Sequence, residues 1–450
     1  MFKKGNQIEL KITSLGSSGE GVGKVDGFTI FVKGALPGEK IRAKITILKK
    51  SYANAQMLQI IDRSPQRQKP FCPLFYKCGG CQLQHLSYEG QLIVKKQQVI
   101  DALERIGHIP NPPVFPVLAD ENPMYYRNKM LCPIASQDGT KIGFYKTGTH
   151  EIVDMQECYI QSQANNIILT TVREWVRKYK ISVYNEESGK GLLRHILGRV
   201  SAATNEVMVG LVCTQKSLPN KLELVEMLKA NIPNLVSVVQ NLNSSNTNVI
   251  MGRTNIVLYG KSVIADKIGS FTFEISATSF FQVNTKQAEK LYQTALDYAK
   301  LSGTETVVDL YCGIGTLSLF LAQKAKNVIG VEVVPIAIDN AEENAKFNKV
   351  KNIEFICDDA TVAMQQISRK NNIDVVVLDP PRAGCEKPLL EQIIQTLPQR
   401  IVYVSCNPAS LARDIKILTD SGDYKLVKVQ PVDMFGQTAH IESVCLLCRK

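Results

Sequence analysis

The run SCNP at residues 405–408 places a cysteine where it could act as a nucleophile. Cys406 ends the β-branched stretch RIVYVSC, and a helix is expected to begin near Pro408. The unpaired N–H groups and the dipole of a helix N-terminus favour a thiolate, and such a position can lower a thiol pKa from about 8.5 by one unit or more. The setting predicts a reactive thiolate, whereas a cysteine without it is more often a buried structural residue.

Other runs bring carboxylates and prolines to the same region. Asp379 opens DPPRAGC directly after the stretch DVVVL, as SCNP directly follows its own stretch. Carboxyl ends of parallel strands meet at one edge of a sheet, so these two runs predict a single cleft. Glu442, in HIES, is a candidate proton acceptor, and an exposed glutamate at the end of a strand is the alternative.

The run DLYCGIG at residues 309–315 predicts a ligand-binding turn. It follows the stretch TVVDL and leads into a helix, and its glycines allow the backbone to approach a ligand closely. Glu332 ends the next strand, 19 residues after Gly313, where a carboxylate can accept protons from both ribose hydroxyls. Ser318 stands where the dinucleotide-binding fingerprint has its third glycine, so the fingerprint is incomplete and NAD is kept only as the rival cofactor. The combination of Asp309, Gly313 and Gly315 resembles the S-adenosylmethionine site of class I methyltransferases.

The elements that position these runs alternate regularly from about residue 300. The stretches TVVDLY, VIGVEV, IEFIC, DVVVLDP and RIVYVSC are separated by helical segments. Continuous β-branched runs predict a parallel, doubly wound sheet that is covered on both faces. The last stretches, KLVKVQPVD and HIESVCLLC, have no helix between them and predict an antiparallel hairpin that closes the sheet.

A nucleophilic thiolate beside a methyl donor has a specific use. Carbon-5 of uracil attacks a sulfonium methyl poorly, but thiolate addition at carbon-6 converts the ring into an enolate whose carbon-5 can attack. The carbon-5 proton must then be removed so that the thiol can be eliminated, which requires a base. Cys406 and Glu442 are the candidates for these two roles.

A second group of cysteines predicts a metal site. Cys72, Cys78 and Cys81 have the spacing C-x5-C-x2-C, and the chain has 12 cysteines without a secretory signal, which indicates thiols or metal ligands rather than disulfides. With a fourth thiolate, the group would accommodate either zinc or an iron–sulfur cluster.

Residues 6–61 predict a small β-barrel that binds nucleic acid. Short alternating stretches are separated by the glycine-rich turns LGSSGEGVGKVDG and GALPGE. Residues 1–70 hold 13 Lys/Arg against 5 Asp/Glu, which accounts for most of the net charge of +11, and such an excess favours phosphate contact; a solubilising lysine face is the alternative. The turns and the run VKGALPGE resemble a TRAM domain, an RNA-binding barrel that accompanies RNA-modifying enzymes.

We expect three domains along the chain. They are a barrel at residues 1–62, a central α+β domain at residues 63–275 and a catalytic α/β domain at residues 276–450. Within the central domain, patterns predict helices at residues 88–106 and 164–180 and strands near residues 141–154 and 206–213.

Aromatic and basic residues mix in MYYRNKM, which contains Arg127 and Lys129, and Phe280 and Phe281 precede Gln282. Such side chains stack on bases and contact phosphates, although each aromatic is individually more often a core residue.

The motifs DPPRAG, SCNPASLARD and HIES together resemble the RNA uracil-5-methyltransferase family, and the resemblance spans the chain. It implies a Rossmann-like class I methyltransferase domain, preceded by the TRAM barrel and the central domain. It assigns Cys406 as nucleophile and Glu442 as base. The S-adenosylmethionine contacts that the motifs imply are Gln282, Tyr311, Gly313, Gly315, Glu332 and Asp379.

Family members with this cysteine pattern carry a [4Fe-4S] cluster, and the resemblance implies Cys158, in DMQECYI, as the fourth ligand; Cys132 competes with it. Because methyl transfer needs no electrons, the cluster is expected to be structural or to contact RNA. A TRAM domain with this cluster is most similar to the dual-site 23S ribosomal RNA enzymes of Gram-positive bacteria, which implies 23S rRNA as the partner.

Three alternatives stay open. The substrate could be transfer RNA, or the enzyme could methylate cytosine through Cys385, which follows a similar proline turn, or the chain could be a catalytically silent RNA-binding assembly factor. Intact Cys406 and Glu442 argue against the last. No stretch approaches the roughly 18 uncharged residues of a membrane span, so we expect a cytoplasmic protein with no membrane or protein partner.

Overall fold

The computed structural model describes residues 2–136 and 139–450, which form two compact units. One unit comprises Met1–Phe71, Cys81–Asp120 and Lys290–Lys450, and the other comprises Cys72–Gly80 and Glu121–Glu289. The segments of the two units alternate along the chain, and the cysteine-rich run is divided, with Cys81 in the first unit. The predicted boundaries at residues 62 and 275 stay predictions.

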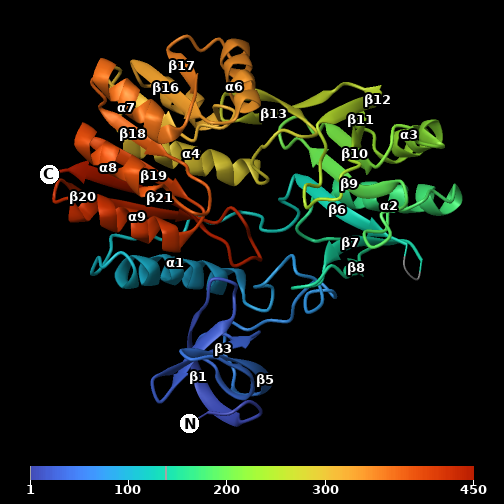
Figure 1. The fold of residues 1–450 in the computed structure, drawn as a ribbon. Coiled ribbons are helices and arrows are strands. Elements are labelled where there is room, and N and C mark those ends of the chain that lie inside the picture. The colour runs from blue at the N-terminus through green and yellow to red at the C-terminus, as the bar shows by residue number, and fades with distance from the viewer. Residues whose placement is uncertain (1, 137–138) are drawn as a thin grey trace. The chain divides into compact units, whose positions relative to one another are not determined.

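The first strands form a closed barrel in the order β1-β2-β3-β5-β4, as the alternation predicts (Figure 1). Every second side chain of β1 and β4 points inward, and Ile12, Ile30 and Ile41 are fully buried in the barrel core. The strands are β1 (Gln7–Leu15), β2 (Gly21–Val25), β3 (Phe28–Lys33), β4 (Lys40–Leu48) and β5 (Tyr52–Asp62).

The catalytic sheet has the order β17-β16-β15-β18-β19-β21-β20. The pairs among β15 to β19 are parallel, and β21 pairs antiparallel with both β19 and β20, so the predicted closing hairpin is confirmed. The strand order reverses between β15 and β18, and ligands of such sheets bind at that reversal, beyond the carboxyl ends of the strands. The strands are β15 (Thr306–Leu310), β16 (Asn327–Glu332), β17 (Ile353–Cys357), β18 (Val375–Leu378), β19 (Arg400–Ser405), β20 (Tyr424–Val432) and β21 (Glu442–Arg449).

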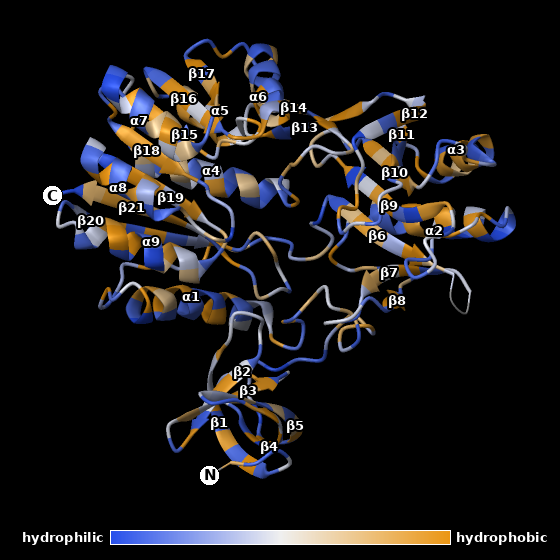
Figure 2. Cartoon of the chain, viewed as in Figure 1, coloured by the Kyte–Doolittle hydropathy of each residue, from blue (hydrophilic) through white to orange (hydrophobic). Residues whose placement is uncertain are grey.

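Helices α1, α7, α8 and α9 pack on the catalytic sheet and on one another around a common apolar core. In Figure 2 the strands of this sheet are mainly orange, and the helices carry blue, polar stripes. Helix α1 begins after Ser87, whose hydroxyl accepts a hydrogen bond from the Gly90 N–H, and its bounds match the predicted helix at residues 88–106. The helices are α1 (Tyr88–Arg105), α4 (Thr285–Ala299), α5 (Thr316–Ala322), α6 (Pro335–Phe347), α7 (Ala360–Lys370), α8 (Lys387–Thr396) and α9 (Pro408–Asp420).

The second unit contains a mixed sheet in the order β12-β11-β10-β9-β6-β7-β8 and the hairpin of β13 and β14. Its core forms where α2 and α3 cover the sheet, and Trp175 of α2 is fully buried there. The elements are β6 (Lys129–Ala135), β7 (Lys141–Tyr145), β8 (Ile152–Asp154), α2 (Gln163–Lys178), β9 (Leu193–Val200), β10 (Val207–Cys213), α3 (Lys221–Asn231), β11 (Leu235–Leu242), β12 (Thr254–Gly260), β13 (Val263–Ile268) and β14 (Phe271–Ser276). The predicted α+β class of this region is confirmed.

Candidate active site

The glycine turn after β15 is held open toward a ligand by left-handed backbone. Gly313 and Gly315 have φ of 57° and 78°, and Tyr311 between β15 and the glycines has φ of 67°. A Cβ atom at Gly315 would lie 2.9 Å from the Phe355 ring, so a side chain there is excluded by space as well as by backbone conformation. Gly315 is therefore required for this turn.

Glu332, at the end of β16, fixes the glycine turn from the side. One carboxylate oxygen accepts a hydrogen bond from the Gly313 N–H at 3.2 Å, and the other accepts one from the Val334 N–H at 3.0 Å. The predicted pairing of a glycine turn with a strand-end carboxylate is thus present in the fold.

Two more carboxylates lie at this edge of the sheet. Asp309 is fully buried and accepts a hydrogen bond from the Ser318 hydroxyl, while its Oδ1 has no hydrogen-bond partner among the described residues. The pKa of Asp309 is raised to about 7, chiefly by burial and in smaller part by the carboxylates of Asp379 and Glu332. Burial also raises the pKa of Asp379 to about 6. Concentrated negative charge and an unpaired acceptor oxygen fit a cationic ligand such as S-adenosylmethionine, whose sulfonium supplies the methyl group.

Cys406 and Glu442 are brought together by strand pairing. Ser405, the last residue of β19, pairs with Ser443 of β21, so the next residue along β19 and the preceding residue of β21 face each other across the same register. Cys406 is half-buried, and Glu442 is 8% exposed. Helix α9 begins at Pro408, as predicted, and its N-cap Asn407 accepts a hydrogen bond from the Ala409 N–H at 3.1 Å.

The expected lowering of the Cys406 pKa is wrong for the free protein. The pKa of the Cys406 thiol is raised to about 11, chiefly by burial and in smaller part by the carboxylates of Glu442 and Asp379, whereas Arg382 lowers it. Desolvation and two carboxylates thus outweigh the N-terminus of α9. Burial, followed by the carboxylate of Asp379, raises the pKa of Glu442 well above its ordinary value.

Cys385, the alternative nucleophile, belongs to the core of the catalytic sheet. Its side chain is 5% exposed, and its N–H donates to Asp414 Oδ2 at 2.8 Å, the atom that also accepts from the Tyr403 hydroxyl at 2.6 Å. Burial raises the pKa of the Cys385 thiol to about 12. This environment suits a packed structural thiol better than a nucleophile.

Gln282 lies in the other unit, between β14 and α4. Its backbone carbonyl accepts a hydrogen bond from the Asn128 amide at 3.0 Å, and the Asn128 N–H donates to the Val283 carbonyl at 2.8 Å. The predicted role of Gln282 as an S-adenosylmethionine contact stays a prediction.

Three of the four predicted cysteine ligands, Cys72, Cys78 and Cys158, lie in one unit. Burial raises the pKa of Cys158, and the thiols of Cys78 and Cys72 raise it further, so these side chains are electrostatic neighbours. Burial likewise raises the pKa of the fully buried Cys132, and the thiols of Cys158 and Cys78 add to that rise. Within residues 2–136 and 139–450, however, no three side chains of His, Cys, Asp or Glu lie close enough to hold a metal ion.

The central sheet contains a group of cations that the sequence pattern identified only in part. Lys129 of β6 pairs directly with Arg199 of β9, so their side chains share one face. The pKa of Lys129 is lowered to about 8, chiefly by burial and in smaller part by the charges of Arg199 and Arg127. Arg199 is 3% exposed and was missed, because an arginine in the apolar run LLRHILGRV gives no signal until its strand is paired with MYYRNKM.

The aromatic residues that could stack on bases differ in their exposure to solvent. Phe281 is buried, and the centroid of its ring lies 5.7 Å from that of the Phe273 ring, whereas Phe280 is 71% exposed. The Tyr125 hydroxyl donates to Glu157 at 2.9 Å. Phe280 is therefore the aromatic of its pair that is available for stacking on a base.

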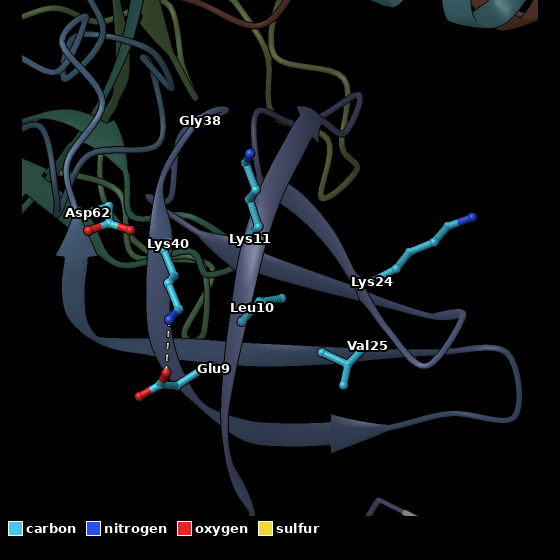
Figure 3. Close-up of a pocket in the computed structure, with 8 residues that line it drawn as sticks. All are labelled: Glu9, Leu10, Lys11, Lys24, Val25, Gly38, Lys40 and Asp62. Carbon is cyan, nitrogen blue, oxygen red and sulfur yellow. Dashed lines mark ion pairs between the residues drawn. The ribbon is translucent and has the colours of Figure 1, made fainter.

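The barrel carries a pocket of about 510 Å³ that is lined by three lysines (Figure 3). Glu9 in this pocket is paired with Lys40 at 3.5 Å and with Arg42 at 2.8 Å. No ion pair among the described residues involves Lys11 or Lys24, and Figure 3 shows the Lys24 side chain directed away from the barrel wall. These lysines are free to contact phosphate.

Comparison with known proteins agrees with this geometry. Residues 192–450 match the family model described as tRNA (Uracil-5-)-methyltransferase, and residues 2–58 match the TRAM domain model. Proteins called uncharacterized RNA methyltransferases are 47% identical in Clostridium acetobutylicum, over 99% of this chain and 98% of theirs, and 48% identical in Clostridium tetani, over 99% and 97%.

The fold also matches a solved structure over nearly its whole length. The Pyrococcus abyssi tRNA (uracil-54, C5)-methyltransferase in complex with S-adenosyl-L-homocysteine is 30% identical, with a TM-score of 0.77 over 98% of this chain and 99% of that one. No helix in the described part of the chain is both long and apolar enough to cross a membrane. The chain belongs to the RNA uracil-5-methyltransferase family, as an S-adenosylmethionine-dependent enzyme with an N-terminal TRAM domain.

Proposed function

We propose that this enzyme methylates carbon-5 of specific uridines in 23S ribosomal RNA, with Cys406 as nucleophile and Glu442 as base. The observation that carries the mechanism is the register of β19 and β21, in which Ser405 pairs with Ser443 and so sets a thiol opposite a carboxyl. The glycine turn and the carboxylates of Asp309, Glu332 and Asp379 lie at the same sheet edge and suit a cationic methyl donor. Tyr311, Gly313 and Gly315 complete the proposed cofactor contacts of this unit, and Gln282 of the other unit is proposed to join them.

The chemistry divides between the two side chains. The Cys406 thiolate bonds to carbon-6 of uracil and breaks the C5–C6 double bond, so that carbon-5 takes the methyl group. Glu442 then accepts the carbon-5 proton, the double bond re-forms and the bond from carbon-6 to sulfur breaks. Both residues must be ionised when they act, although burial raises the pKa of both groups in the free protein.

The identity of the RNA is tested by methyl mapping. Unmodified transcripts of 23S rRNA and of transfer RNA are incubated with enzyme and labelled S-adenosylmethionine, and the modified nucleosides are located by mass spectrometry. We expect 5-methyluridine in 23S rRNA; label confined to transfer RNA, or found as 5-methylcytidine, would overturn the proposal.

Transfer RNA is the competing substrate, and a specific observation favours it. The Pyrococcus abyssi enzyme acts on a transfer RNA uracil and matches 98% of this chain, a span that includes the barrel. The barrel alone therefore does not separate ribosomal from transfer RNA, and the proposal of 23S rRNA rests on the cysteine pattern together with the barrel.

We also propose a [4Fe-4S] cluster on Cys72, Cys78, Cys81 and Cys158, with zinc as the alternative occupant. Cys78 and Cys72 raise the pKa of Cys158, and Cys72 raises that of Cys78, which supports a shared site because thiols affect one another only when close. Anaerobically purified protein should contain about four iron and four sulfide per chain and absorb near 400 nm. Cys158→Ser should lose most of the iron, whereas Cys132→Ser should keep it. Bound zinc without sulfide would contradict the cluster.

A further inference from the structure

Helix α1 presents polar side chains on the face that it buries. Tyr88, Gln91 and Lys95 are spaced by three and four residues, so they share one face of the helix. Gln91 and Lys95 are both 0% exposed, although lysine and glutamine rarely occupy a fully buried position. All three contact residues 433–441, the segment between β20 and β21 that we call the 433–441 loop.

A buried ion pair fixes the beginning of this loop. Lys95 Nζ lies 2.6 Å from Asp433 Oδ1 and also donates to the Phe435 carbonyl at 3.1 Å. The Tyr88 hydroxyl donates to Asp433 Oδ2 at 2.8 Å, so both carboxylate oxygens have partners. Desolvation makes a buried ion pair a weak source of net stability compared with apolar residues of the same volume. What the pair does supply is a fixed place for Asp433 and Phe435.

A reciprocal amide pair fixes the middle of the loop. The Gln91 side-chain N–H donates to Gln437 Oε1 at 3.0 Å, and the Gln437 backbone N–H donates to Gln91 Oε1 at 3.0 Å. Gln437 has φ of 70°, a left-handed conformation that a non-glycine residue adopts only where its surroundings enforce it. Gln91 therefore stabilises a strained backbone.

The loop that α1 fixes leads directly into the proposed base. Glu442 is the first residue of β21, and it pairs with Val432, the residue before Asp433. Strand pairing holds the backbone of Glu442, and the loop residues behind it determine how the chain enters β21. Small displacements of a catalytic group are enough to slow a reaction greatly.

We propose that the polar face of α1, formed by Tyr88, Gln91 and Lys95, positions Glu442 for removal of the carbon-5 proton by way of the 433–441 loop. This inference rests on the proposed function. Cys406 directly follows β19 and is not held by the 433–441 loop. Loosening the loop should therefore slow proton removal and elimination more than it slows thiolate addition and methyl transfer.

The test uses full-length enzyme, methyl-labelled S-adenosylmethionine and an unmodified RNA transcript that the wild-type enzyme methylates. On a denaturing gel, methyl label that migrates with the protein marks methylated RNA still bonded to the enzyme. Ribonuclease should trim this species to a labelled protein–nucleotide adduct. Glu442→Gln is the reference variant and should accumulate this adduct.

Gln91→Met keeps the side-chain volume and removes the amide pair without leaving a buried charge. We expect it to form adduct at a rate within about threefold of wild type and to release methylated RNA at least tenfold more slowly. Gln97→Met is the matched control, because Gln97 lies on the exposed side of the same helix and bonds only locally to Asp101. It should behave like wild type.

The double variant Lys95→Met with Asp433→Asn removes both charges of the buried pair at once and should give the same delayed release. Gln91→Met that turns over normally, or that loses adduct formation and release in equal proportion, would overturn the inference alone. Glu442→Gln that releases RNA normally would remove Glu442 from the proposed function and overturn this inference with it.

Discussion

Cys406, Glu442 and Asp379 influence one another at the carboxyl edge of the catalytic sheet. Burial raises the pKa of both the Cys406 thiol and the Glu442 carboxyl, and the carboxylate of Asp379 adds to both rises. A positively charged cosubstrate favours the ionised forms of both groups. We therefore expect a bound cationic cosubstrate to promote ionisation of the Cys406 thiol.

The state of Cys406 can be measured by alkylation of the free enzyme. Because its pKa is about 11, the rate of iodoacetamide labelling at Cys406, resolved by peptide mass spectrometry, should rise about tenfold per pH unit between pH 7 and 9. Asp379→Asn should speed the labelling and Arg382→Gln should slow it. A rate that levels off below pH 8 would show a thiolate already formed.

We expect Asp309 to destabilise the fold and to strengthen the binding of S-adenosylmethionine. Its carboxyl has a folded pKa of about 7, above the ordinary value, so its ionisation destabilises the fold as pH rises from about 4 to 7. Asp309→Asn should raise the free energy of unfolding, by about 2 kcal/mol more at pH 8 than at pH 5, and should weaken S-adenosylmethionine binding. Urea unfolding at both pH values and calorimetric titration check this. An unchanged difference between the two pH values would contradict the buried acid.

At the scale of elements, the strands of the catalytic sheet could be predicted from the sequence, but the long-range polar contacts that hold its loops could not. Continuous β-branched stretches followed by DLYCGIG, DPPRAG and SCNP identify parallel strands and the edge where their loops meet, because these signals are local. The pair of Lys95 and Asp433 joins residues far apart in sequence, and neither residue carries a local motif. Arg199 was missed for the same reason, since only the register of β6 and β9 sets it beside Lys129.

The glycine turn offers a sharp test of one element. Gly315→Ala combines a φ of 78° with a contact of 2.9 Å to Phe355, whereas Gly422 has φ of 86° and open space around it. Gly422→Ala should lose about 1 kcal/mol from backbone strain alone and keep its affinity for S-adenosylmethionine. Gly315→Ala should lose more stability and at least tenfold in affinity. Equal effects in the two variants, measured by thermal unfolding and titration, would remove the turn from the cofactor site.

At the scale of the whole molecule, the order of segments along the chain differs from a simple succession of compact units. Residues 81–120 join residues 290–450 in one unit, because α1 packs on α9 and the chain near Val114 and Leu118 bridges to β20. The amphipathic pattern predicted α1 but not its partner, since an apolar stripe does not specify which surface covers it. The cysteine-rich run was recognised by spacing, yet its division between the units depends on tertiary packing.

The barrel is expected to add affinity for RNA without adding sequence selectivity. Lys11→Gln with Lys24→Gln should weaken RNA binding and reduce the slope of log affinity against log salt by about 1 to 2. Lys324→Gln with Lys326→Gln changes the same charge at exposed positions outside the barrel and should leave the slope unchanged. Filter binding at several salt concentrations checks both, and equal slopes in the two double variants would exclude the barrel pocket from RNA contact.

The central claim is that the Cys406 sulfur bonds to carbon-6 of a uracil, and trapping that bond tests it directly. RNA transcribed with 5-fluorouridine has no carbon-5 proton to lose, so the enzyme and S-adenosylmethionine should form a stable adduct. Peptide mass spectrometry after ribonuclease digestion should find the nucleotide on Cys406, and Cys406→Ala should form no adduct. An adduct on Cys385, or one that persists in Cys406→Ala, would contradict the account.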